Sequence, residues 1–325
     1  MRAFVTGGSG FVGRNLLEAL RQRGDTVRAL ARSGEAIDVV SRRGAMPVRG
    51  DLDTTEVMRD AMRGFDVVFH VAALASEWGA PKLFHRINVE GTRHVIAAAR
   101  DAGVSRLVHV STEAVLLGGP PLRNADETRP RPFRPVGPYG WSKGLAEAEV
   151  LAENQRGLET VVVRPRLIWG TGDTTVLPRM VQAVRDGKFM WIAGGRYLTS
   201  TCHVRNACEG LLLAAERGRP GEIYFVTDGA PVEFRAFITA LLRSQGVEPG
   251  DRSAPRWAVR LAAPAAEAAW RALPLRGAPP INRAILVTIG DEVTVSDAKA
   301  RRELGYRGQV TIHAGLAEMS GAPPV

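Results

Sequence analysis

The side chains best suited to acid–base chemistry are a tyrosine and a lysine four residues apart, Tyr139 and Lys143. If this stretch is helical, the two side chains lie on one face of the helix. A free phenol has a pKa of about 10 and is a poor proton donor or acceptor at neutral pH. A neighbouring ammonium group favours the phenolate and lowers that pKa. The spacing therefore predicts a phenol that moves a proton to or from a substrate oxygen.

Two hydroxyl groups, Ser111 and Thr112, directly follow the apolar stretch Arg106 to Val110, which is typical of a buried strand. Either hydroxyl could hydrogen-bond to the oxygen that the phenol protonates. Such a set suits hydride transfer between a substrate carbon and a nicotinamide, with Tyr139 moving the proton and Lys143 binding the nicotinamide ribose.

A glycine-rich turn, Thr6 to Gly13, joins an apolar stretch at residues 2–5 to a helical pattern at residues 15–21. Glycines permit a tight turn and a close approach of the backbone to a pyrophosphate. The N-terminus of the following helix favours a phosphate group. The sequence therefore predicts a dinucleotide site at Gly7, Ser9, Gly10, Phe11, Val12 and Gly13.

Strand-like and helix-like patterns alternate over the first two hundred residues. Further strands are expected at 26–31, 46–49, 66–71, 106–110 and 160–164, and helices at 54–62, 91–102 and 139–155. This alternation predicts an α/β fold with a doubly wound parallel sheet of the Rossmann type. The proline-rich stretch from Gly118 to Pro138 is predicted to be a loop.

Ligands of such sheets bind beyond the carboxyl ends of the strands, so the residues after each strand carry information. Arg32 follows the second strand, where an acidic residue would hold a ribose 2′-hydroxyl group. Its guanidinium suits a 2′-phosphate instead, which favours NADP over NAD, although NAD stays possible. Other residues in such positions are expected to meet the cofactor: Asp51, Leu52, Ala72, Ala73 and Asn88.

The charge, the apolar runs and the cysteine and histidine positions argue against several classes of protein. The 325-residue chain has a formal net charge of +9, but its arginines are scattered and no nucleic-acid partner is expected. No apolar run approaches the roughly 20 residues of a transmembrane helix, and no signal segment is evident, so a cytoplasmic location is expected. Cys202 and Cys208 are expected to be buried thiols. The histidines lack the spacing of metal ligands, and His109 is expected to be a satisfied core residue.

Taken together, these motifs resemble the extended short-chain dehydrogenase/reductase family, and most closely its 3-beta-hydroxysteroid dehydrogenase/isomerase branch. Pointers to that branch are the stretches Trp78 to Pro81, Trp169 to Asp173 and Thr199 to Asn206. The resemblance implies a catalytic set of Thr112, Tyr139 and Lys143, with Ser111 and Pro165 beside the cofactor. It also implies a smaller α+β substrate lobe at the C-terminal end. We expect the enzyme to be a homodimer.

The expected division is a nucleotide-binding domain at 1–168 and a lobe at 169–325 that mainly binds substrate. Within the lobe, helices are expected at 206–216 and 234–245, and a strand near 222–226 could return to the main sheet. The alanine-rich stretch from Trp257 to Leu273 is interrupted by Pro264. We interpret it as a kinked packing helix; an apolar lid or a membrane-surface helix is the alternative.

Large apolar side chains beyond the strand ends predict a bulky, largely apolar alcohol or ketone as the substrate. The wall of the substrate pocket is expected to include Trp78, Glu113, Trp141 and Trp169. One rival function is a sugar-nucleotide epimerase or dehydratase. Relatives of that class usually carry an arginine five residues before the position of Val204, and this chain has Thr199 there. The other rival, a non-catalytic NADP-sensing regulator, would have lost Tyr139 and Lys143.

Overall fold

The computed structural model describes residues 1–273, 275 and 277–321. Within them, a parallel sheet of seven strands forms the centre of the molecule. From one edge to the other, the strands are β12 (Ile223–Val226), β7 (Glu159–Pro165), β5 (Arg106–Val110), β4 (Val67–His70), β1 (Arg2–Thr6), β2 (Thr26–Ala31) and β3 (Met46–Arg49). The predicted doubly wound parallel sheet is confirmed, because the strand order reverses its direction at β1.

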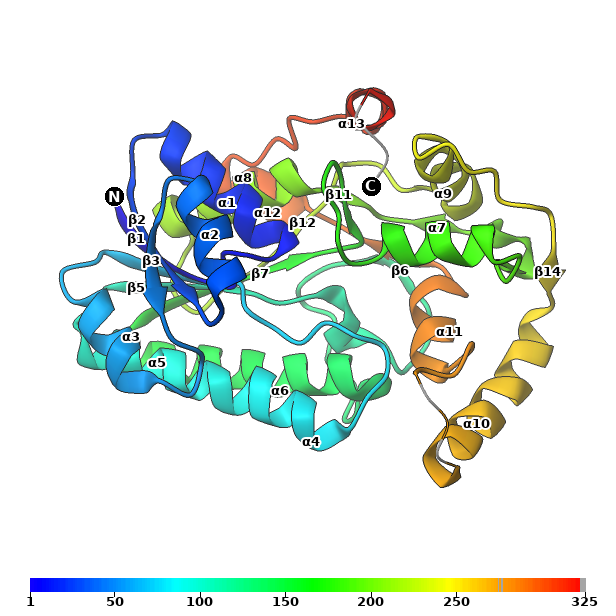
Figure 1. Ribbon diagram of the computed structural model, residues 1–325, viewed down its shortest axis with the longest axis horizontal. Coiled ribbons are helices and arrows are strands. Elements are labelled where there is room, and N and C mark those ends of the chain that lie inside the picture. The colour runs from blue at the N-terminus through cyan, green and yellow to red at the C-terminus, as the bar shows by residue number, and fades with distance from the viewer. Residues whose placement is uncertain (274, 276, 322–325) are drawn as a thin grey trace.

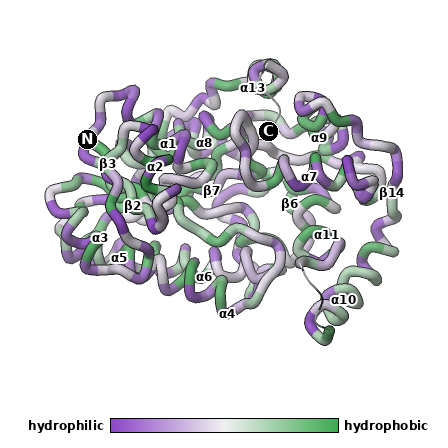
Figure 2. Tube along the Cα trace, in the orientation of Figure 1, coloured by the Kyte–Doolittle hydropathy of each residue, from purple (hydrophilic) through white to green (hydrophobic). Residues whose placement is uncertain are grey.

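Helices cover both faces of this sheet (Figure 1). One face carries α1 (Phe11–Gln22), α2 (Gly34–Arg42), α8 (Val204–Arg217) and α12 (Ala298–Leu304), and the other carries α3 (Thr55–Met62), α5 (Gly91–Asp101) and α6 (Gly137–Glu153). Their apolar residues recur at helical spacing and face inward, as with Leu16, Leu17 and Leu20 of α1, which are fully buried. Figure 2 shows apolar stretches along the central strands.

Among the elements that were not predicted from the sequence are α2 and β6 (Leu122–Ala125). The helix α2 begins after Ser33, whose Oγ accepts a hydrogen bond from the Ala36 amide at 3.2 Å as an N-cap. The strand β6 lies inside the segment predicted as a loop, and that part of the prediction is wrong. Leu122 is buried there because β15 (Val293–Val295), far along the chain, pairs with it.

The C-terminal half builds smaller sheets and helices against the carboxyl end of the main sheet. A mixed sheet joins β6 and β15 to β10 (Leu198–Thr199) and β13 (Val232–Glu233), and two-stranded sheets join β8 (Ile168–Trp169) to β11 (Cys202–His203) and β9 (Trp191–Ile192) to β14 (Ser253–Ala254). The helices here are α7 (Leu177–Arg185), α9 (Phe234–Arg243), α10 (Arg256–Ala272), α11 (Arg283–Ile289) and α13 (Ile312–Ser320). The short elements that remain are α4 (Pro81–Phe84), a π-helix (His85–Glu90) and 3₁₀ turns at Glu113–Leu116, Asn154–Arg156 and Ala193–Gly195.

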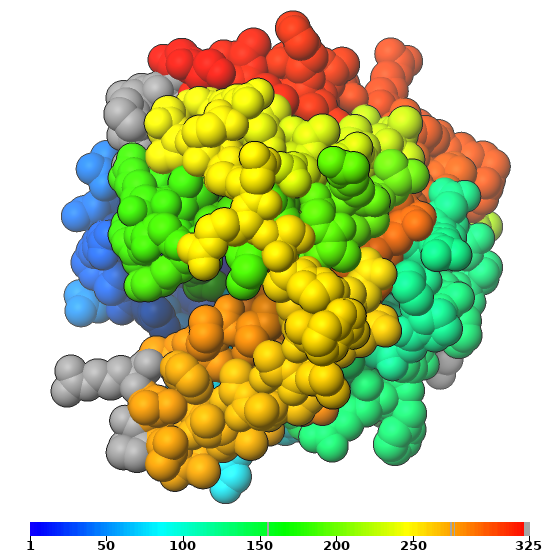
Figure 3. All heavy atoms as spheres, turned by 90° about the vertical axis from the view of Figure 1, so that its right-hand side faces the viewer, coloured from blue at the N-terminus to red at the C-terminus, as the bar shows by residue number. Residues whose placement is uncertain are grey.

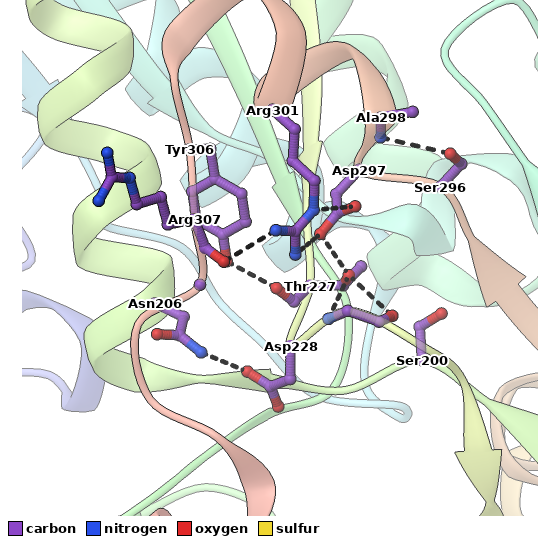
Figure 4. Close-up of polar contacts among 12 residues, drawn as sticks. Ser200, Asn206, Thr227, Asp228, Ser296, Asp297, Ala298, Arg301, Tyr306 and Arg307 are labelled. Atoms are coloured by element: carbon purple, nitrogen blue, oxygen red, sulfur yellow. Dashed lines mark hydrogen bonds and ion pairs between the residues drawn. The ribbon is translucent and has the colours of Figure 1, made fainter.

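The strand β12 returns from the C-terminal half and pairs with β7 in parallel. A buried polar network at its end fastens the later segments to the sheet (Figure 4). There the Asp228 carboxylate accepts a hydrogen bond from Asn206 Nδ2 at 2.7 Å, and Thr227 Oγ1 donates to Asp297 Oδ2 at 2.9 Å. The main sheet and the C-terminal segments thus share one core, and the division of the chain at residue 168 stays a prediction.

The helix α10 is present where a kinked helix was expected, with Pro264 inside it. It packs through Val259, Ala263 and Glu267, whereas Trp257 and Leu261 are 68% and 71% exposed. Only one face of the helix is therefore a packing face, and Figure 3 shows α10 in gold beside α11 in orange on the surface of that side. Among the described residues, no helix is both long and apolar enough to cross a membrane.

Candidate active site

A cleft of about 830 Å³ opens at the carboxyl ends of β1, β2, β3, β4, β5 and β7. Parallel strands present their following loops at one edge of the sheet, so residues far apart in the chain meet there. Most of the predicted site residues line this cleft: Gly7, Ser9, Gly10, Phe11, Val12, Gly13, Arg32, Asp51, Leu52, Ala72, Ala73, Ser111, Thr112, Glu113, Tyr139 and Pro165.

The glycine turn after β1 has a shape that only glycine allows. Gly7 has φ +73°, and a Cβ atom there would lie 2.6 Å from the Ala72 amide nitrogen. A Cβ atom on Gly13 would lie 2.0 Å from the Gly7 carbonyl oxygen. Gly10 precedes α1 without any side-chain cap, and the first turn of α1 has no acidic residue. The helix N-terminus therefore faces the cleft with amides suited to a phosphate, which fits a dinucleotide.

Four arginines line the cleft, and three of them are paired with carboxylates. Their contacts are Arg86–Asp53 at 2.9 Å, Arg166–Glu113 at 2.8 Å and Arg179–Glu77 at 3.2 Å. Arg32, at the end of β2, is exposed and has no ion pair within the part of the chain that the structure describes. Its guanidinium is thus the one in this group whose charge is not offset by a carboxylate.

Thr112 and Tyr139 both line the cleft. Thr112 Oγ1 donates to Glu113 Oε2 at 2.9 Å, and Glu113 in turn pairs with the buried Arg166. Burial and, to a lesser degree, the Glu113 charge raise the pKa of Tyr139, while the Thr112 hydroxyl acts in the opposite direction. Tyr139 is therefore a protonated phenol at neutral pH, which suits a proton donor.

Ser111 has a different environment from Thr112. Its Oγ donates to Glu147 Oε2 at 2.7 Å, and Glu147 is held by the Nε of Arg164 at 2.9 Å. All three side chains are buried. Ser111 and Thr112 therefore each donate their hydroxyl proton to a buried glutamate, and the two differ in which glutamate accepts it.

Lys143 follows Tyr139 by four residues on α6, is only 2% exposed and is not part of the cleft lining. Its Nζ contacts the Val110 carbonyl oxygen at 2.7 Å and His109 Nε2 at 3.0 Å. Burial lowers the pKa of Lys143 to about 7, against the opposing effect of Glu147. The sequence predicted that Lys143 would lower the pKa of Tyr139, but here burial and Glu113 dominate at the phenol.

Asn88 is buried behind the cleft and connects two of its walls. Its Nδ2 donates to Leu74 O at 3.1 Å and to Ser142 Oγ at 2.9 Å, and its Oδ1 accepts from the Leu74 amide at 2.7 Å. These bonds join the loop after β4 to α6, the helix of Tyr139. The structure thus places Asn88 where it holds the site together, without access to the cleft itself.

The structure separates the predicted substrate residues. Trp78 and Trp141 line a second pocket of about 430 Å³, between the loops at 77–81 and 134–138 and the helices α10 and α11. Glu77 lines both spaces and marks their boundary. Trp169 lies in neither: it is 1% exposed, and its Nε1 donates to Asp228 Oδ2 at 2.7 Å. Leu116 and Leu117 are likewise buried in the core.

Some residues of the cleft, among them Arg166 and Thr288, are not in the predicted set of site residues. Arg166 directly follows β7, so its position at a strand end was a usable signal, although the direction of its side chain was not. Thr288 reaches the cleft from α11, and its carbonyl oxygen accepts from Arg166 Nη2 at 2.7 Å. No local pattern marks Thr288, because only tertiary packing brings α11 to this edge. Among the described residues, no group of His, Cys, Asp and Glu is arranged to hold a metal ion.

Comparison with known proteins decides the family. A profile of the 3-beta hydroxysteroid dehydrogenase/isomerase family matches residues 4–256. The chain belongs to this family. Family membership agrees with the glycine turn, the tyrosine–lysine pair and the predicted resemblance, and it makes the protein an NAD(P)-dependent oxidoreductase of the extended short-chain dehydrogenase/reductase type.

Two named relatives match this chain over nearly its whole length. The chain is 54% identical to the 4-hydroxy-2-methyl-3-oxo-4-farnesyl-3,4-dihydroquinoline-1-oxide ketoreductase of Stigmatella aurantiaca, covering 100% of this chain and 97% of the relative. It is 36% identical to the 2-alkyl-3-oxoalkanoate reductase of Stenotrophomonas maltophilia, with 99% of each chain covered.

Solved structures share the fold. The crystal structure of gox2253 superposes with a TM-score of 0.79 at 29% identity, covering 97% of each chain. The dTDP-glucose 4,6-dehydratase DesIV of Streptomyces venezuelae, solved with NAD and TYD bound, gives a TM-score of 0.77 at 26% identity, covering 98% of this chain and 96% of that one.

Proposed function

We propose that the protein is a ketone reductase that uses NADPH to reduce a bulky, largely apolar ketone to the secondary alcohol. The observation that carries this proposal is the protonated Tyr139 phenol beside Thr112, in the same cleft as the glycine turn. The two named relatives described above are reductases, which supports the direction of the reaction. Reduction needs a proton donor at the new alkoxide, and a phenol with a raised pKa keeps that proton until it is needed.

In this mechanism, the Thr112 hydroxyl turns its proton from Glu113 to the carbonyl oxygen of the substrate, and with Tyr139 it binds and polarises that oxygen. When bound, the cofactor supplies a hydride to the carbonyl carbon. Tyr139 transfers its Oη proton to the oxygen as negative charge develops there, and the alcohol forms. Lys143 lies four residues further on α6, and its ammonium would then stabilise the phenolate that remains.

The preference for NADPH is proposed from Arg32. It lies at the end of β2, where the adenine ribose is expected, and it has no carboxylate partner among the described residues. A 2′-phosphate would supply the missing negative charge through a charge-assisted hydrogen bond. The glycine turn, Asp51, Leu52, Ala72, Ala73 and Pro165 would line the remaining length of the cofactor.

The second pocket suggests how a long substrate is accommodated. We place the reacting ketone beside Tyr139 and Glu113 in the cleft, and the distal apolar part of the substrate past Glu77, between Trp78 and Trp141. The two indole rings offer a large apolar area, and the Arg271 guanidinium already lies 5.2 Å from the centre of the Trp78 ring. The printed names of the two relatives, with a farnesyl group and an alkyl group, fit such a division.

The main alternative is a sugar-nucleotide epimerase or dehydratase, because DesIV shares the fold. A sugar diphosphate needs cations that are free to meet two phosphates. In the cleft, Arg86, Arg166 and Arg179 are already neutralised by Asp53, Glu113 and Glu77. Binding a diphosphate beside the reaction centre would require these pairs to break, which favours the ketone reductase.

The test is a screen of NADPH oxidation against ketones of increasing size and apolar content, with nucleotide sugars as competitors. The proposal expects turnover of at least some bulky ketones and no competition by nucleotide sugars. Tight binding of a nucleotide sugar without reduction of any ketone would overturn it. The homodimer and the cytoplasmic location stay predictions.

A further inference from the structure

His109 makes an unexpected contact with the lysine of the proposed catalytic set. His109 lies on β5, is fully buried, and has its Nε2 3.0 Å from Lys143 Nζ. In the sheet it lies beside His70 of β4, which lies beside Thr6 of β1, so the three form one row across adjacent strands. The two imidazole rings are 5.1 Å apart.

The two histidines of this row differ in their hydrogen bonds. His70 is satisfied at both nitrogens, by Thr6 Oγ1 at 2.7 Å and by Thr92 Oγ1 at 2.8 Å. His109 Nδ1 is buried and has no hydrogen-bond partner among the described residues. The sequence-based expectation that His109 is a satisfied core residue is therefore wrong at one of its two nitrogens.

This arrangement fixes the tautomer of His109 when Lys143 is charged. An ammonium group has only protons to donate, so Nε2 must accept, and the ring proton resides on the unpartnered Nδ1. A buried N–H without a partner destabilises the fold, and an apolar side chain in its place would not. Lys143 is the one polar partner of the His109 ring within the described structure. The contact with Lys143 therefore explains why an imidazole occupies this position.

We propose that His109 is a positioning residue, whose Nε2 holds the Lys143 ammonium together with the Val110 carbonyl oxygen. These two acceptors take two of the three ammonium protons and leave one for a further acceptor. The benefit for catalysis rests on the proposed function, in which Lys143 serves the cofactor ribose and Tyr139. The hold of His109 on Lys143 does not depend on it.

The other ionisable groups around Lys143 determine the direction of the expected effect. On α6, Glu147 favours the ammonium but is itself paired with Arg164. On the sheet, His70 and His109 stay neutral, because burial and the Lys143 charge lower the pKa of both. On the cleft side lie Tyr139, which is protonated, and Glu113, which is paired with Arg166. Removing the Nε2 acceptor of His109 therefore destabilises the charged form of Lys143 relative to its neutral form, which lowers the pKa of Lys143 further.

The chain has four lysines, Lys82, Lys143, Lys188 and Lys299, so each can be followed by NMR in protein labelled with ¹³C at the lysine Cε. The cofactor-free enzyme is titrated, and Lys143→Met identifies the Lys143 signal. We expect a midpoint near 7 in the natural protein, a fall of about one to two pH units in His109→Leu, and a midpoint near the natural one in His109→Gln, whose amide oxygen can replace Nε2.

The matched control is His203→Leu. His203 is also a buried imidazole with an unpartnered nitrogen, but it packs against Trp169 and makes no contact with Lys143. The control should leave the Lys143 midpoint unchanged. An unchanged midpoint in His109→Leu, or an equal fall in the control, would overturn the proposal.

Two further readouts separate this role from a merely structural one. At pH 9, where Lys143 is neutral in both folded proteins, His109→Leu should melt at the same temperature as the natural protein or higher, because a buried nitrogen without a partner is removed; a lower melting temperature at that pH would indicate a structural role. NADPH affinity should fall as pH rises through the Lys143 midpoint, and this fall should begin at a lower pH in His109→Leu. If the natural protein neither bound NADPH nor reduced ketones, the proposed function would be refuted. The NMR titration of Lys143 in the cofactor-free protein would still test whether His109 holds the Lys143 ammonium.

Discussion

Arg166 Nη1 lies 2.8 Å from Glu113 Oε1, and both side chains are almost completely buried at the floor of the cleft. The pair joins the end of β7 to the turn after β5, and Glu113 also accepts the Thr112 proton. It therefore orients one of the hydroxyl groups proposed to meet the substrate.

Glu113→Ala should lower the free energy of unfolding by about 3–5 kcal/mol, because it leaves the Arg166 charge buried and unpaired. The double variant Glu113→Leu/Arg166→Met should recover most of that loss, and urea denaturation measures both. The matched control is Glu248→Ala, which breaks an exposed pair with Arg243 and should scarcely change stability. A double variant no more stable than Glu113→Ala would show that the loss does not come from an unpaired Arg166 charge.

Tyr139→Phe should lower turnover about 100- to 10,000-fold while leaving NADPH affinity nearly intact, because only the proton donor is removed. Turnover is followed by NADPH oxidation, and affinity by fluorescence titration. Lys143→Met should differ by weakening both binding and turnover. Turnover near that of the natural protein in Tyr139→Phe would refute the assigned proton donor.

Arg32→Asp should move cofactor preference from NADPH towards NADH by about ten- to a hundredfold, since a charge-assisted contact is worth about 1.5–3 kcal/mol. The ratio of kcat/KM for the two cofactors measures the change. Arg86→Ala is the control, because Arg86 lines the same cleft but is already paired with Asp53. If the natural protein prefers NADH, Arg32 does not have the proposed role.

Trp141→Ala should lower kcat/KM for ketones with a long apolar chain by roughly ten- to a hundredfold, since burying an aromatic side chain is worth about 1.5–3 kcal/mol. Small ketones should be affected much less, as they do not extend past Glu77. A series of increasing chain length makes the comparison. Trp257→Ala, an exposed tryptophan on α10 outside the pocket, should show no dependence on chain length; equal losses for all ketones in Trp141→Ala would contradict a tail pocket.

The sequence predicted those parts of the fold that depend on local pattern. The glycine turn, the alternating strands and helices, and the placement of Tyr139 and Lys143 on one helix, α6, all follow from patterns along the chain. The edge of the sheet where parallel strands end then gathers most of the predicted cofactor residues by topology alone.

What the sequence could not predict depends on contacts between distant segments. The strand β6 exists because β15 lies beside it, some 170 residues later, where Asn124 and Thr294 are hydrogen-bonded. The separate pocket of Trp78 and Trp141 is closed by α10 and α11. Trp169 was placed in the substrate wall because it follows a strand, but Asp228 draws its indole into the core. The direction of a side chain after a strand end is not a local property.

The position of β12 has a consequence for how the protein is made. As the chain leaves the ribosome, β7 is synthesised well before Ile223–Val226, its neighbour at the edge of the sheet. Until then, one edge of β7 presents backbone amides and carbonyl oxygens that have no hydrogen-bond partners. The side chains of Val161, Val162 and Val163 on this strand are completely buried in the folded protein. The seven-stranded sheet is therefore complete only after the C-terminal half has emerged, and until then β7 is an edge of the kind that favours aggregation.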